Sequence, residues 1–370
     1  MSQCIGDHGA SHGEFAELAA SDEVAKLVTV SEDGGMVDAI FFRCRYASVL
    51  KENPTVSIRH LLGLIAGALC IAFAPIFAVL SRQGPGQVGM WDSAFWRVFI
   101  GAIALGILFA LQRQRLLPKR EEFAIGKGFS SHAWIWLPGL VFAGDFWAWH
   151  WSFEHTSVAN STLLANTAIL WVTIFAWLVW KERLSHLFLV GAGAAFVGMI
   201  FLMLSSTTRV PPTTGSPVFG DFLALLTAGF YAAYQLSMKR FRREHSAPRL
   251  MFWASAVGAI VLFPLAWFHP DPFWPDSGEV WGALIGLGVL SHACGQGLIA
   301  YGLGGLPASL ASVTLLVQPV ATAFLGVWLL AQPLVPIQIL GAVIVVTGLF
   351  FAIRGQMARK ELSDTRETSP

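Results

Sequence analysis

The chain has 370 residues, of which 55% are hydrophobic and only 13% are charged, and its formal net charge is +1. Soluble domains carry about 25% charged residues, so this composition excludes an ordinary soluble protein and predicts a membrane protein with several crossings. The four cysteines have no metal-ligand spacing, and two of them lie in apolar segments. We therefore expect no metal site, no cofactor and no disulfide framework, and no nucleic-acid partner.

Residues 1–58 are polar and acid-leaning and show no sustained periodicity. They contain no apolar segment of the signal-peptide type, so no cleavable signal peptide is expected. We expect a disordered cytoplasmic tail here. A later start of translation, at Met36, is left open, and so is whether the first 35 residues are made.

Apolar segments of membrane-spanning length come after the tail. Each holds about 20 residues, which at a rise of 1.5 Å per residue crosses the hydrocarbon core of a bilayer. Several contain Pro or Gly, which membrane helices tolerate where neighbouring groups satisfy the backbone. The pattern predicts ten transmembrane helices, near residues 61–80, 93–111, 134–153, 157–179, 186–204, 219–238, 251–268, 281–301, 307–329 and 335–353.

The distribution of Lys and Arg predicts the orientation of these segments. All but three of the 24 basic residues fall in regions that ten crossings and a cytoplasmic N-terminus place inside. The exceptions are Arg82 and Arg209, which fall outside, and Arg97, which lies within a segment. The positive-inside rule therefore favours a multi-pass protein of the cell (inner) membrane with both termini in the cytoplasm.

Two halves of the chain match each other at a constant spacing, which pairs Gly191 with Gly341 and Gly198 with Gly348. The repeat unit holds five segments, an odd number, so the two copies must have opposite orientations in the membrane. Inverted repeats are typical of alternating-access carriers. The expected divisions are a tail at 1–58, a first repeat at 59–204, an external linker at 205–218, a second repeat at 219–353 and a cytoplasmic tail at 354–370.

Two stretches carry a family resemblance. The first half reads T-S-V-A-N-S-T-L-L-A-N, then an apolar run and W-K-E-R-L-S, and the second half reads L-P-A-S-L-A-S-V-T-L-L-V-Q-P-V. The chain resembles the drug/metabolite transporter superfamily, EamA type, over about residues 60–353. The resemblance implies a transporter and not an enzyme, and it favours export over uptake. Ile169 stands where the family often has Pro, and Gln332 where an acid is common, so the halves are unequal.

Asp145 is the strongest candidate for a functional residue, because an acid in the middle of an apolar segment is costly and is functional by default. Trp149 lies one turn further along the same helix face. We interpret Asp145 as a binding site for a substrate cation or a proton, with a structural ion pair or a hydrogen-bonded acid as the alternative. Arg97 is interpreted in three ways: it binds a substrate carboxylate, pairs with Asp145, or extends toward the membrane interface.

Further polar and aromatic residues are candidates to line a cavity. His292 and Gln296 are four residues apart and are expected to share a helix face, either in the site or in a polar contact between helices. The amides and tyrosines serve either as ligand groups or as bonds between helices, and Trp171, like Trp149, is a candidate to stack on the substrate. These remaining candidates are Asn160, Asn166, Gln318, Tyr231, Tyr234, Gln235 and Trp171.

The sequence therefore predicts a ten-helix membrane bundle of two inverted five-helix repeats that moves a small polar or amphipathic metabolite by alternating access. It contains no nucleotide-binding motif in a suitable context, which favours gradient-driven or facilitated transport. A coupling proton or ion and a homodimer are left open as partners. The alternatives are a non-transporting membrane scaffold and an intramembrane protein that acts on lipid.

Overall fold

A computed structural model describes residues 57–82, 85–114, 134–153, 155–156, 158–204, 216–331 and 334–367. The chain divides into two units, Met1–Asn53 and Pro54–Pro370. The first unit lies outside the described residues, as does nearly all of the expected N-terminal tail and most of the expected linker at 205–218. Every described helix belongs to the second unit.

The described part of this unit contains helices and no strand. Several helices have proline at their first or second position. Proline is favoured there because the backbone N–H groups of the first turn have no partner within the helix, and proline has no N–H. The helices are α5 (Ile58–Ile71), α6 (Ala74–Leu80), α7 (Met90–Arg113), α8 (Leu137–Ser152), α9 (Val158–Ala165), α10 (Ala168–Leu178), α11 (His186–Leu204), α12 (Pro217–Phe241), α13 (Ala247–Trp267), α14 (Gly278–Gly286), the π-helix η1 (Leu287–Gln296), α15 (Gly297–Leu303), α16 (Ala308–Thr314), α17 (Val317–Leu330) and α18 (Pro336–Glu367).

Nine helices in the described residues are long and apolar enough to cross a membrane, and their bounds agree with the expected segments to within a few residues. Some of these nine consist of consecutive shorter helices, such as α5 with α6 and α16 with α17. The one expected segment without a counterpart among these nine is the third, 134–153, which corresponds to α8, a helix of 16 residues. The last helix is longer than expected, because α18 continues to Glu367 through most of the segment expected as a tail.

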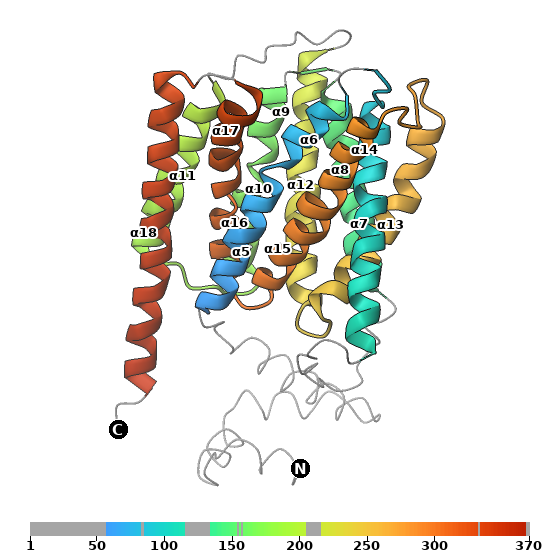
Figure 1. Ribbon diagram of the computed structural model, residues 1–370. Helices are drawn as coiled ribbons and strands as arrows, with labels where there is room; N and C mark the ends of the chain where they lie inside the picture. Colours follow the sequence, from blue (N-terminus) through green and yellow to red (C-terminus); the bar gives the residue numbers. More distant parts are fainter. Residues whose placement is uncertain are drawn as a thin grey trace, which may run out of the picture. The chain divides into compact units, whose positions relative to one another are not determined.

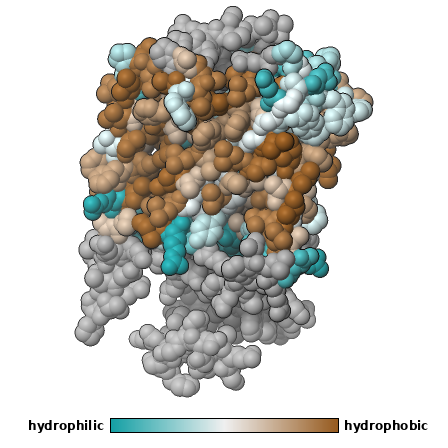
Figure 2. All heavy atoms as spheres, viewed as in Figure 1, coloured by the Kyte–Doolittle hydropathy of each residue, from teal (hydrophilic) through white to brown (hydrophobic). Residues whose placement is uncertain are grey.

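Large apolar side chains face outward over much of this unit, and Figure 2 shows them as a broad hydrophobic surface across the middle of the molecule, with hydrophilic residues gathered near its upper right. Such a surface suits contact with lipid, since a soluble monomer rarely exposes so large an apolar patch. The lower end of the bundle in Figure 1 carries the start of α5 and the linker between α10 and α11. The upper end carries the start of α7 and the loop 268–277.

The helices pack in pairs that correspond to the two repeats. Helix α8 packs on α12, and in the same way η1 and α15 pack on α5, while α7 packs on α13. At the left of Figure 1, α11 and α18 lie side by side along most of their length. Glycines make this last approach close: a methyl group at Gly198 would lie 2.7 Å from the carbonyl oxygen of Gly341. The matching glycines of the two repeats therefore meet at one crossing.

Candidate functional site

A cavity of about 180 Å³ lies within the bundle and is lined by seven of the predicted site residues. Its walls come from α6, the first turns of α7, α8, the junction of α9 and α10, α12, η1 and the start of α17. The lining is mixed, with apolar and aromatic groups beside a small number of polar ones, as in most small-molecule sites. The predicted residues that line it are Arg97, Asp145, Trp149, Asn166, Tyr231, Gln296 and Gln318.

Interrupted helices bring several of these groups to the cavity. The first crossing breaks between α5 and α6, next to Pro75, and Pro75 lines the cavity. The break between α9 and α10 places Asn166 there, where its Nδ2 donates to the carbonyl oxygen of Thr162 at 2.8 Å. A corresponding break before α17 places Gln318 there. Irregular backbone at membrane depth is tolerated where it lines a cavity.

Asp145 and Arg97 are the two ionisable side chains of opposite charge in this lining. Arg97 is 9% exposed, and its Nε has no hydrogen-bond partner in the described part of the chain. Its guanidinium lies over the ring of Phe146, 5.1 Å from the ring centroid, a cation–π contact that orients the group. No described residue forms a hydrogen bond or a salt bridge with Asp145, so the direct pairing with Arg97 that the sequence allowed does not occur within 4.0 Å.

One wall of the cavity is aromatic. Phe142 and Phe146 lie one turn apart on α8 with ring centroids 4.7 Å apart, and Tyr234 stacks on Phe142 at 4.4 Å. The hydroxyl of Tyr234 lies 3.3 Å from Oε1 of Gln296 and donates to it. This contact ties α12 to η1 just behind the lining. The wall offers a flat apolar surface beside the two charged groups.

The π-helix η1 decides which of its residues face the cavity. Nine residues separate Leu287 from Gln296, which is about two and a half turns of an α-helix and would place them on opposite faces. The wider π turn, with its i→i+5 bonds, brings nine residues close to two full turns, and both side chains line the cavity. Gly67 of α5 and Gly101 of α7 let these two helices approach η1 closely.

Five predicted residues do not line the cavity. His292 is fully buried behind Phe142, and its Nε2 lies 2.9 Å from Oγ of Ser255 in α13, so it makes the contact between helices that was the alternative for it. Tyr234 and Gln235 are buried beside the cavity. Asn160 donates to Asp221 near the upper end, and Trp171 is 54% exposed on the outer surface of α10.

Residues outside the predicted set also line the cavity. Phe142, Phe146 and His150 line the cavity along one face of α8, at the i, i+4 spacing that Asp145 and Trp149 share on the same helix. Thr227 lies one turn before Tyr231. That spacing could have identified them. In the described part of the chain, no group of three or more His, Cys, Asp or Glu residues could hold a metal ion.

Apolar helices in two matched sets, around a cavity with mixed polar and aromatic walls, define a class of helical membrane transporters. Within this class the chain belongs to the EamA-like transporter family, whose model matches residues 60–204 and 218–354. The two matches confirm the repeat and the resemblance to the drug/metabolite transporter superfamily.

Curated relatives and a solved structure agree with this family. YwfM of Bacillus subtilis (strain 168), an uncharacterized transporter, is 27% identical over 198 residues, which span 53% of this chain and 64% of YwfM. The pseudopaline exporter CntI of Pseudomonas aeruginosa (strain UCBPP-PA14) is 24% identical over 231 residues, or 62% of this chain and 74% of CntI. One solved crystal structure superposes on this chain with a TM-score of 0.66 at 18% sequence identity. The match covers 80% of this chain and 97% of the chain in that structure, and it supports the fold only.

Proposed function

We propose that this transporter is a secondary carrier that exports a small amphipathic metabolite across the cell (inner) membrane by alternating access. The observation that supports it is the cavity in which Asp145 and Arg97 are both present without a direct partner among the described residues. Ionisable groups inside a membrane protein that make no salt bridge are costly, and a bound ligand of complementary charge offsets that cost.

The chemistry of the lining suggests what such a ligand carries. The carboxylate of Asp145 suits a cationic group, and the planar guanidinium of Arg97 suits a carboxylate. Phe142, Phe146 and Trp149 offer surface for an apolar part. A cavity of about 180 Å³ restricts the ligand, in this conformation, to a molecule of modest size.

Two observations bear on the direction of transport. The pseudopaline exporter among the relatives is named for export. The distribution of basic residues favours a cytoplasmic location for the lower end of the bundle by the positive-inside rule, and the part of α7 that lines the cavity is its first turns, which lie toward the upper end.

Counterflow in proteoliposomes tests the proposal. The panel holds labelled zwitterions, amines without a carboxylate, and carboxylates without an amine, each with and without an apolar side group. We expect exchange of a zwitterion, and we expect Asp145→Asn and Arg97→Gln each to lower its rate at least about tenfold, since hydrogen bonds to charged groups contribute about 1.5–3 kcal/mol. Asp271→Asn, at a half-exposed carboxylate in the upper loop, is the matched control.

The outcomes separate the parts of the proposal. Exchange that Asp145→Asn leaves at the full rate would remove Asp145 from the site while the carrier assignment stands. Folded protein that exchanges nothing would favour a lipid substrate or the scaffold alternative. Counterflow proceeds without an ion gradient and so does not test coupling. Repeating the successful exchange under an imposed proton or sodium gradient does test it.

A further inference from the structure

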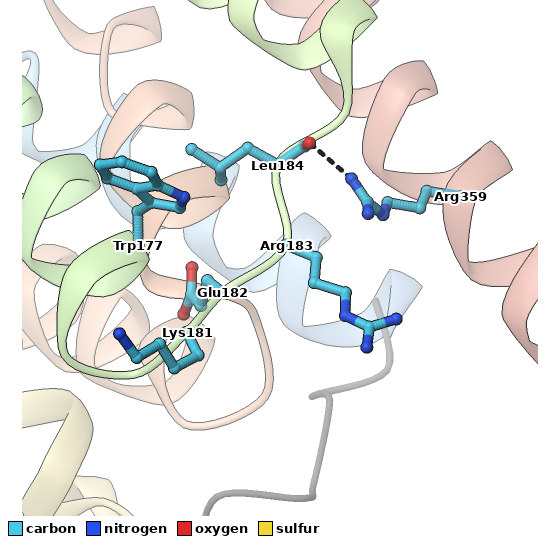
Figure 3. A pocket seen from close by; sticks show the side chains of 6 residues that line it. All are labelled: Trp177, Lys181, Glu182, Arg183, Leu184 and Arg359. Carbon is cyan, nitrogen blue, oxygen red and sulfur yellow. Dashed lines mark hydrogen bonds between the residues drawn. The ribbon is translucent and has the colours of Figure 1, made fainter.

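The linker between α10 and α11 contains a buried acid. Residues Lys181, Glu182 and Arg183 are consecutive there, and Lys181 adopts a left-handed backbone with φ 54°. Lys181 and Arg183 are exposed, whereas Glu182 is only 8% exposed. Figure 3 shows the side chains of Lys181 and Arg183 pointing to opposite sides of the linker, and neither forms a salt bridge or a hydrogen bond with Glu182 among the described residues. The acid therefore has a partner elsewhere.

That partner is the start of α16, which belongs to the other half of the chain. Oε1 of Glu182 accepts from the backbone N–H of Ala308 at 2.7 Å. Its Oε2 accepts from the backbone N–H of Ser309 at 3.2 Å and from the hydroxyl of Ser309 at 2.8 Å. Both carboxylate oxygens thus accept hydrogen bonds, and two of the three donors are first-turn backbone N–H groups that have no partner within their own helix. Hydrogen bonds to a carboxylate are roughly twice as strong as neutral ones.

This contact lies below the cavity. Every residue of α16 is at most 1% exposed, and none of them lines the cavity, whose lowest group from this crossing is Gln318 at the start of α17. Helix α16 also packs on α10, the helix that leads into the linker. The buried helix α16 therefore lies between Gln318 and the lower end of the bundle, where the linker of Glu182 lies.

The repeat gives Glu182 no identical counterpart. The constant spacing between the repeats pairs it with Gln332, which lies outside the described residues. An amide carries no negative charge, so the hydrogen bonds that it accepts are weaker than those of a carboxylate.

We propose that Glu182 is a positioning residue that clamps α16 to the first half and keeps the cavity closed toward the cytoplasm. The inference rests on the proposed alternating access, in which this clamp must release before the cavity can open inward. Glu182 contacts no substrate in this scheme. It sets how often the carrier faces inward.

Labelling of single cysteines with a membrane-impermeant thiol reagent tests the proposal without knowledge of the substrate. In a background without the four native cysteines, Ser312→Cys reports on α16 from the cytoplasmic side, in inside-out vesicles, and Ala78→Cys reports on the cavity from outside. We expect Glu182→Gln to raise labelling of the first reporter at least about tenfold and to lower labelling of the second. Glu279→Gln, at an exposed acid in α14, is the matched control.

Opposite changes at the two reporters are the signature of a shifted conformational equilibrium. A merely structural role predicts that both reporters become more reactive, which would overturn the proposal, and so would wild-type labelling of both. Should Glu182→Gln fail to fold, Ser309→Ala removes one of the three donors and is expected to produce the same opposite changes at smaller size. Absence of transport with the expected labelling would reject the proposed substrate and leave the clamp in place.

Discussion

Two tryptophans of this transporter occupy opposite surroundings although both lie in membrane-spanning helices. Trp149 lines the cavity, and its Nε1 has no hydrogen-bond partner among the described residues. Trp171 is 54% exposed on the outer surface of α10, where lipid would contact it. The indole N–H of Trp149 is thus available as a donor to a ligand, since a buried Trp usually finds a partner for this group.

Substitution of these residues by phenylalanine tests the difference. Trp149→Phe is expected to raise the KM for the exchanged substrate about tenfold, because it removes one donor and part of the stacking surface. Trp171→Phe is the matched control and is expected to leave KM unchanged. Concentration-dependent counterflow measures both, and an equal effect at the two positions would show that Trp149 does not contact substrate.

The sequence identified cavity residues where a polar group interrupts an apolar segment. Asp145, Arg97, Asn166 and Gln318 were found in this way, and the cavity contains all four. Glu182 was not found, because it lies in a short run of charges that the positive-inside rule already explains. Its role depends on a helix start more than a hundred residues away, and no local pattern indicates such a contact.

At the scale of the helices, hydropathy predicted where each crossing lies but not how it is built inside. The breaks between α9 and α10 and between α16 and α17, and the π-helix η1, leave the apolar pattern unchanged. Hydropathy reports how apolar a segment is and not how its backbone is hydrogen-bonded. Helix α18 is longer than the expected crossing, since a polar helix can continue beyond the membrane.

The crossing of α11 and α18 gives a prediction at this scale. A methyl group at Gly198 would lie 2.7 Å from backbone atoms of α18, so Gly198→Ala must separate the two helices and is expected to destabilise the protein by about 1–3 kcal/mol. Gly193, on the same helix, has nothing within 4 Å of such a methyl group. Gly193→Ala is therefore expected to be neutral or stabilising, as helix propensity alone would make it.

Thermal unfolding in detergent compares the two variants with the parent protein. A lower Tm for Gly198→Ala alone supports the close crossing. Equal Tm values would mean that α11 and α18 can separate without loss of stability.

At the scale of the whole described unit, the two family matches establish the repeat. Nine helices among the described residues are long and apolar enough to cross a membrane. The tenth crossing and the orientation remain predictions. Their common basis is the distribution of charge, because an error of one crossing would exchange the sides of every later loop. The side on which each loop lies is therefore a direct test of the number of crossings that precede it.

Two exposed loop residues make this test. Asp276 lies in the loop at the upper end, and Arg183 lies in the linker at the lower end. An impermeant maleimide is expected to label Asp276→Cys in intact cells and Arg183→Cys only in inside-out vesicles. The reverse pattern would mean either the opposite orientation or one crossing fewer before Arg183, and labelling of both from one side would contradict the number of crossings between them.

The π-helix η1 has a consequence for how relatives are compared. An alignment without a gap assumes that equal positions in two chains face the same way. Because η1 holds more residues per turn than an α-helix, a relative with a regular α-helix here would direct the residue aligned with Gln296 to a different face. A ligand preference transferred between such relatives by aligned position would then be assigned to the wrong side chain. A one-residue deletion within 287–296 would therefore indicate altered selectivity more strongly than several substitutions.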